Sequence, residues 1–146
     1  GMTIEGFYAL GVKKDIDNCL TRYVSGTVPD DFGTIGETHY LQAVENLKTK
    51  IDFFGMQEHY DESLILLAGK LGWPLPVYRK KNLTRKKEIV SEETLEFLKH
   101  ANRWDILLYE KAKEIFAEKL DQMTAKEKRK LARLRFLNKI AGAIPF

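Results

Sequence analysis

The sequence predicts a mainly helical protein with one or a few short strands, and three observations lead to this prediction. Apolar residues recur at helical spacing, as in Tyr40, Val44, Leu47 and Ile51. Residues that favour helix starts and glycines that favour helix ends flank these runs. The chain has 146 residues, of which 44% are hydrophobic, so it fits one domain and leaves little room for two.

Two short helices are predicted near the N-terminus. The first covers about 3–10 and ends at the glycine that follows it. The second covers 18–24, with Asp15 or Asp17 as its cap and a glycine at its end. The stretch 27–36 holds a proline, two acids and two glycines, which predicts an exposed loop.

The middle of the chain predicts a helix, a strand and another helix. The stripe beginning at Tyr40 gives the first of these helices. The segment 51–55 is short, apolar and bounded by glycine, which favours a buried strand. A helix then begins at Asp61, its expected N-cap, and ends at Gly72. The large side chains expected in the core are Phe53, Phe54, Leu64, Leu67 and Trp104.

The last part of the chain predicts an irregular segment followed by three helices. The irregular segment is 73–87, which begins with two prolines that disfavour helix. Ser91 precedes two glutamates and favours a helix start, and Asn102 favours a restart three residues before Asp105. The terminal helix begins with a Thr124–Glu127 capping box and has an amphipathic pattern.

Positive charge is concentrated in two segments. The segment 79–87 carries six cations and no acid, and 126–139 carries seven cations and one acid, which gives +12 together. Because the whole chain is +3, the remainder sums to 3 − 12 = −9. Such segments bind phosphate, sulfate or nucleic acid in some proteins and are ordinary solvated faces in others.

Several classes of protein and site are disfavoured. No apolar run approaches the ~20 residues of a membrane span, so no membrane partner is expected. No secretory signal is recognisable, and the single cysteine excludes an internal disulfide and a cysteine-based zinc site, which favours a reducing, cytoplasmic setting. The three histidines lack a ligand spacing, so no metal is expected. The string 6–13 is a poor match to a phosphate-binding loop, because its lysine is misplaced and no hydroxyl follows.

The basic segment 79–87 is the best candidate site. Arginine offers a bidentate fork to a phosphate or sulfate group, lysine a point charge, and Asn82 and Thr84 short donors. A charged surface loop without a ligand is the alternative interpretation of the same residues.

Short strings along most of the chain resemble one family in their order. They read N-x-x-T-R-x-x-x-G, A-x-x-N-L, F-x-G-x-x-E-x-x-x-x-S-L and L-G-W, followed by N-L-T-R and D-I-x-L-Y-E, and they lie at 18–26, 43–47, 53–64, 71–73, 82–85 and 105–110. Together they resemble the C-terminal half of the carbohydrate-type sulfotransferases, of the Golgi and heparan sulfate 2-O-sulfotransferase type. Domain 1–123 is then sulfotransferase-like, and 124–146 is an added basic amphipathic helix.

The resemblance implies a P-loop-like α/β fold of which this chain is the helical C-terminal portion. It implies transfer of a sulfuryl group from 3′-phosphoadenosine 5′-phosphosulfate to a carbohydrate hydroxyl, without a metal. The loop that binds the 5′-phosphosulfate and the catalytic base precede the matched strings in the family. We therefore expect no catalytic residue in this chain, and a truncated protein that is inactive or weakly active alone. The donor-binding residues carried over by the resemblance are Arg79, Lys81, Asn82, Thr84 and Arg85, with Lys80, Lys86 and Lys87 as neighbours.

Two interpretations of function stay open at this point. In the first, the chain binds a sulfated or phosphorylated ligand and associates with a second copy or an N-terminal partner half through apolar surface around Phe53 and Phe54. The terminal helix is the other candidate cover for that surface. In the second, the chain is a small helical module that binds nucleic acid, another polyanion or a protein. Nucleic acid is the less favoured ligand, because the aromatic residues fall mostly on core stripes rather than among the cations. Arg22, Glu58 and Ser63 are expected to have structural roles.

Overall fold

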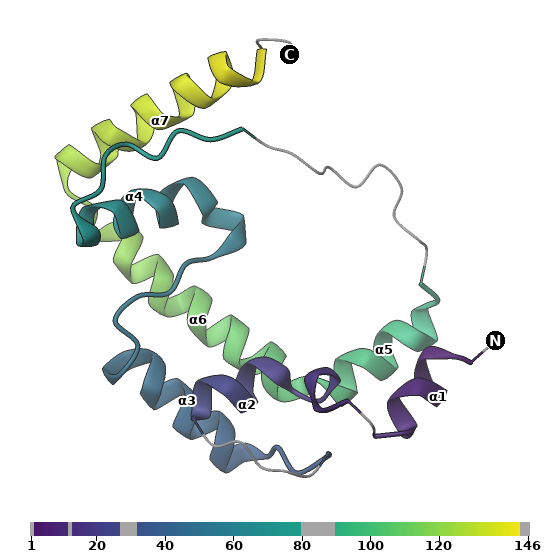
Figure 1. The fold of residues 1–146 in the computed structure, drawn as a ribbon. Coiled ribbons are helices and arrows are strands. Elements are labelled where there is room, and N and C mark those ends of the chain that lie inside the picture. The colour runs from purple at the N-terminus through teal and green to yellow at the C-terminus, as the bar shows by residue number, and fades with distance from the viewer. Residues whose placement is uncertain (1, 12, 27–31, 80–89, 144–146) are drawn as a thin grey trace. The chain divides into compact units, whose positions relative to one another are not determined.

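The computed structural model describes residues 2–11, 13–26, 32–79 and 90–143, and these are mainly helical (Figure 1). The prediction of a mainly helical protein is therefore confirmed. Within the described ranges no strand is formed. The chain divides into two compact units, one of residues 1–52 and 88–115 and the other of 53–87 and 116–146. The division at residue 123 that the resemblance implies stays a prediction.

The first unit is built from short helices around a partly polar interior. Helix α2 packs on α3, and α1 packs on α5. Its buried apolar side chains include Ala43 and Leu47 of α3 and Leu108 and Ala112 of α6. The helical elements of this unit are α1 (Ile4–Ala9), η1 (Lys14–Ile16), α2 (Cys19–Ser25), α3 (Glu37–Thr49), α5 (Glu92–Ala101) and the first part of α6 (Arg103–Asp121).

The second unit pairs two helices over an apolar core. Helices α4 and α7 lie side by side (Figure 1). Ile65 of α4 and Leu131 and Leu134 of α7 form a buried cluster with Met123, and Leu66, Leu75 and Leu120 pack around it. The elements of this unit are η2 (Gln57–His59), α4 (Tyr60–Leu71), the end of α6 and α7 (Ala125–Ala143).

Several helix ends lie where local sequence signals place them. The Thr3 hydroxyl accepts a hydrogen bond from the Gly6 backbone N–H, and the Ser91 hydroxyl accepts one from Thr94. Thr124 and Glu127 form the expected reciprocal capping box. Two glycines in the left-handed region, at φ 71° and 66°, end α2 and α4. Helix α4 begins at residue 60, so the expectation that Asp61 is its N-cap is wrong, and Asp61 lies in the first turn.

The strand expected over 51–55 is not formed. The Ile51 N–H donates to the Asn46 carbonyl at 2.8 Å, and the Met56 N–H donates to the Ser63 hydroxyl at 2.9 Å. The segment is thus held by the helices at its two ends, and no neighbouring strand among the described residues is present to pair with it. A Cβ at Gly55 would stand 2.9 Å from Ser63 Cβ, so glycine permits this close approach.

The large side chains expected in the core lie mostly at its margin. Phe53, Phe54, Leu64, Leu67 and Trp104 are all only half-buried. The fully buried large apolar residues are instead Ile65, Leu108, Phe116 and Leu134. On α4 the buried apolar residues are Ile65 and Ala68 rather than the expected Leu64 and Leu67.

Candidate functional site

Of the predicted donor-binding residues, Arg79 alone lies within the described part of the chain, where it is half-buried. Lys81, Asn82, Thr84 and Arg85 lie outside the described residues, as do the neighbours Lys80, Lys86 and Lys87. The site is therefore built from the residues that lead into the basic segment and from the helices that hold them.

Tyr78, which directly precedes Arg79, is fixed on three sides within the second unit. Its backbone N–H donates to Asn138 Oδ1 of α7 at 3.0 Å, and its hydroxyl donates to Asp61 Oδ1 of α4 at 2.7 Å. Its ring meets the Tyr60 ring edge-on, with the two centroids 5.1 Å apart. The basic segment therefore starts from a point that is tied to both α4 and α7.

The hydroxyl of Tyr78 is kept protonated. Burial, the hydrogen bond to Asp61 and the negative charge of Asp61 raise the pKa of Tyr78 to about 12. At neutral pH the hydroxyl is therefore a hydrogen-bond donor committed to Asp61. It has no lowered pKa that would suit it to act as a general base.

Arg135 of α7 is occupied by the acids in the first turn of α4. Its Nη2 lies 2.7 Å from Glu62 Oε1, and its Nε lies 3.5 Å from Asp61 Oδ2. This cation therefore links α7 to α4 instead of adding to the free positive charge. The exposed cations left on α7 are Lys126, Lys128, Arg129, Arg133 and Lys139.

Asn138 supplies one further polar group beside the entrance to the basic segment. Its Nδ2 is buried and has no hydrogen-bond partner within the part of the chain that the structure describes. An unpaired amide donor of this kind is costly when buried, and it is suited to an anion or a water molecule. The arrangement thus places a half-buried arginine and an amide donor next to a fixed tyrosine.

The N-x-x-T-R string has a structural role in the first unit. Arg22 is 2% exposed, and its Nη2 lies 2.7 Å from Asp17 Oδ2, which confirms the expectation that Arg22 holds the fold. Asp17 also accepts from the Gly33 N–H at 2.7 Å. The N-cap of α2 is Asn18, so the expectation that Asp15 or Asp17 caps this helix is wrong. Asp17 is instead committed to Arg22 and Gly33.

Helices α2 and α6 cap each other within this unit. The Asp105 carboxylate accepts from the backbone N–H groups of Leu20 and Thr21, at 2.9 and 2.7 Å. The Asn18 side-chain oxygen in turn accepts from the N–H groups of Trp104 and Asp105, at 3.0 and 3.3 Å. Each helix start is therefore satisfied by a side chain from the other, which explains both polar residues without a ligand.

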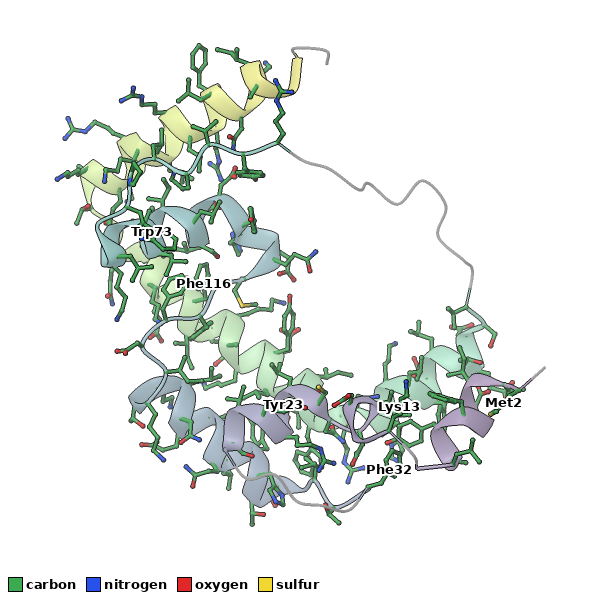
Figure 2. The ribbon with its side chains drawn as sticks, viewed as in Figure 1. Met2, Lys13, Tyr23, Phe32, Trp73 and Phe116 are labelled. Carbon is green, nitrogen blue, oxygen red and sulfur yellow. The ribbon has the colours of Figure 1, made fainter. Side chains whose placement is uncertain are left out.

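An apolar pocket of about 250 Å³ lies between the segment 53–57 and α4. The ring of Phe54 lies 6.1 Å from the ring of Phe116 of α6 and 4.3 Å from Lys119 Nζ of the same helix. Phe116 is labelled in Figure 2. The terminal helix packs on α4 through Leu131 and Leu134. The expectation that this helix covers the surface around Phe53 and Phe54 stays a prediction. The pocket is lined by Phe53, Gly55, Met56, Gln57, Tyr60, Ser63, Leu64 and Leu67.

Within the described residues, the remaining chemical motifs give no second site. The string 6–13, weighed as a phosphate-binding loop, begins inside helix α1. His39 Nδ1 accepts from the Gly36 N–H, and the His59 ring stacks on Phe116. Among the residues described, no group of three or more His, Cys, Asp or Glu side chains is placed to hold a metal ion, and no helix has the length and apolar character to cross a membrane.

Comparisons with models of protein families, with curated proteins and with solved structures found no match to this chain.

The contacts that anchor Tyr78 could not be predicted from the sequence. Its neighbours in space are Asp61 and Asn138, which lie 17 and 60 residues away along the chain. No local pattern signals contacts at that separation.

Proposed function

We propose that this chain is the C-terminal part of a sulfotransferase fold and that its segment 79–87 holds a phosphate group of 3′-phosphoadenosine 5′-phosphosulfate. The observation that carries the proposal is the anchoring of Tyr78 to Asp61 and Asn138, which gives the cationic segment a fixed start. A basic segment whose first residue is held in place loses less conformational entropy on binding an anion than one whose first residue is free.

The groups near this start suit an anionic ligand. Arg79 supplies a guanidinium fork, and Asn138 supplies a buried amide donor that has no partner among the described residues. Tyr78 positions this part of the chain and stays protonated, so it takes no proton from an acceptor hydroxyl. The bound donor nucleotide would supply the activated sulfuryl group.

We do not assign a catalytic residue. No matched string of the family contains the base or the 5′-phosphosulfate loop, and those preorganised groups supply much of the rate in such reactions. The proposal is therefore binding without efficient transfer by this chain alone. The apolar pocket beside Phe53 is the surface where we propose that a partner half or a second copy docks.

Calorimetric titration with adenosine 3′,5′-bisphosphate tests the proposal. We expect micromolar binding that weakens at least about tenfold in Arg79→Ala/Arg85→Ala, because charge-assisted hydrogen bonds are lost. Lys48→Ala/Lys50→Ala is the matched control, since it removes two exposed cations at the end of α3 in the other unit. Equal weakening in both double variants would refute a specific site.

A second candidate function is the binding of nucleic acid or another polyanion. It is favoured by the five exposed cations of α7 that no acid of α4 occupies. Binding of a generic oligonucleotide with a steep salt dependence, together with no binding of the bisphosphate, would establish this second function instead.

A further inference from the structure

The outward face of α7 carries exposed apolar side chains that have no role in the proposed function. Leu131 and Leu134 are buried against α4, whereas Phe136 is 64% exposed and Ile140 is 45% exposed. Residues four apart lie on the same face of a helix, so Phe136 and Ile140 form an apolar pair one turn apart. In the sequence the same spacing continues to Ile144, which lies outside the described residues.

Cations accompany this apolar pair along the same face. Arg129 and Arg133 precede Phe136 at helical spacing, and Lys139 flanks Ile140, with all three cations exposed. The single acid of α7, Glu127, is committed to Thr124, and those hydrogen bonds lower its pKa. The outward face, defined here by Arg129, Arg133, Phe136, Lys139 and Ile140, is therefore cationic and apolar together.

The combination of cationic and apolar side chains on this face fits some binding partners better than others. A second copy of α7 would bring Arg129 and Arg133 against the same cations, and like charges facing each other oppose association. A nucleic acid would engage the cations through its phosphates but would leave the aliphatic Ile140 without a partner. The surface of an anionic bilayer provides negative headgroups for the cations and an acyl boundary for the two apolar side chains.

We propose that the outward face of α7 docks on the surface of an anionic lipid bilayer, with the helix lying in the plane of the interface. Phe136 and Ile140 enter the acyl boundary, and Arg129, Arg133 and Lys139 face the headgroups. The expectation of no membrane partner rests on the absence of a spanning segment, and a helix that lies on a bilayer needs no such segment. This proposal does not depend on the bisphosphate site.

Co-sedimentation with vesicles tests this proposal on the full chain. We expect binding to phosphatidylserine/phosphatidylcholine vesicles and little binding to pure phosphatidylcholine vesicles. Phe136→Ser/Ile140→Ser should reduce vesicle binding at least about tenfold, because apolar burial in the bilayer is lost. Arg129→Gln/Arg133→Gln should also reduce vesicle binding at least about tenfold, because each cation near an anionic surface raises the affinity roughly fivefold.

Two controls keep the result interpretable. Leu41→Ser replaces an apolar residue of α3 that is 56% exposed, and it should leave vesicle binding unchanged. Circular dichroism and thermal unfolding should show that every variant folds, because the substituted side chains are exposed.

Four results would overturn the proposal. The first two are equal binding to neutral and anionic vesicles and unchanged vesicle binding in Phe136→Ser/Ile140→Ser. The third is oligonucleotide binding through Arg129 and Arg133 without vesicle binding. The fourth is a dimer in light scattering that becomes a monomer in Phe136→Ser/Ile140→Ser. Loss of bisphosphate binding with vesicle binding retained would refute the proposed function alone.

Discussion

Replacing Asn18 tests the mutual capping of α2 and α6. Its side-chain oxygen caps α6, and its Nδ2 donates to Asp17 Oδ1 and to the Ala101 carbonyl, both at 3.0 Å. Its backbone lies in the left-handed region, at φ 45°, which asparagine tolerates better than alanine does. Asn18→Ala therefore removes a cap, removes two partly or fully buried hydrogen bonds and strains the backbone.

The expected loss of stability follows from these terms. The cap contributes about 1 kcal/mol, each lost hydrogen bond about 1 kcal/mol, and the left-handed conformation costs alanine roughly 1 kcal/mol. We expect Asn18→Ala to lower the free energy of unfolding of the first unit by about 3–4 kcal/mol. Asn18→Gly removes the same hydrogen bonds without the backbone strain, so it should cost about 1 kcal/mol less.

The assay is urea unfolding followed by tryptophan fluorescence. The chain has two tryptophans, so in a Trp73→Phe background Trp104 reports the first unit alone. Trp104 stacks on Tyr40, with ring centroids 6.0 Å apart, so its emission should change when the unit unfolds. A cost below about 1 kcal/mol for Asn18→Ala, or a glycine variant no better than the alanine variant, would refute the reasoning.

Two further predictions concern the second unit. Gly55→Ala should destabilise it by about 1–3 kcal/mol in thermal unfolding, because the new Cβ would stand 2.9 Å from Ser63 Cβ; Gly69→Ala, where the nearest atom is 3.7 Å away, should be neutral or stabilising. In an absorbance titration, Tyr78→Phe should remove a tyrosine that titrates near pH 12. The pKa of Tyr78 in the folded protein lies above its ordinary value of 10.0. The contribution of Tyr78 to stability is therefore complete below pH 10 and is lost as the pH rises through about 12. A parallel loss of stability in wild type and Tyr78→Phe over that window would contradict this account.

Local signals predicted many of the helix boundaries. Ser91 and Thr124 cap helices as expected, because a cap depends on atoms within three residues of it. Thr3 caps α1 for the same local reason, although only the helix and not its cap was predicted there. The glycines after α2 and α4 end those helices for an equally local reason, since glycine adopts positive φ without strain.

Contacts between distant residues could not be predicted in the same way. Asp105 was expected to support its own helix start but caps α2 instead, and Asn18 caps α6 across more than eighty residues of chain. The segment 51–55 has a composition that favours a strand, yet a strand needs a partner, and composition does not reveal whether one is present.

The candidate site was predictable only in part. The density of cations marked the basic segment, and Arg79 is the one predicted ligand that the described residues include. The positions of Asp61 and Asn138 around Tyr78 depend on how α4 and α7 pack, and a leucine-rich pattern on each helix does not fix that packing.

Backbone NMR during titration with adenosine 3′,5′-bisphosphate tests most directly whether the basic segment binds a nucleotide phosphate. We predict that the amide signals of Tyr78 and Arg79 shift, together with the side-chain amide of Asn138, while the Trp104 indole signal in the other unit stays in place. Shifts confined to the first unit, or no shift at Arg79 at saturating ligand, would contradict the account.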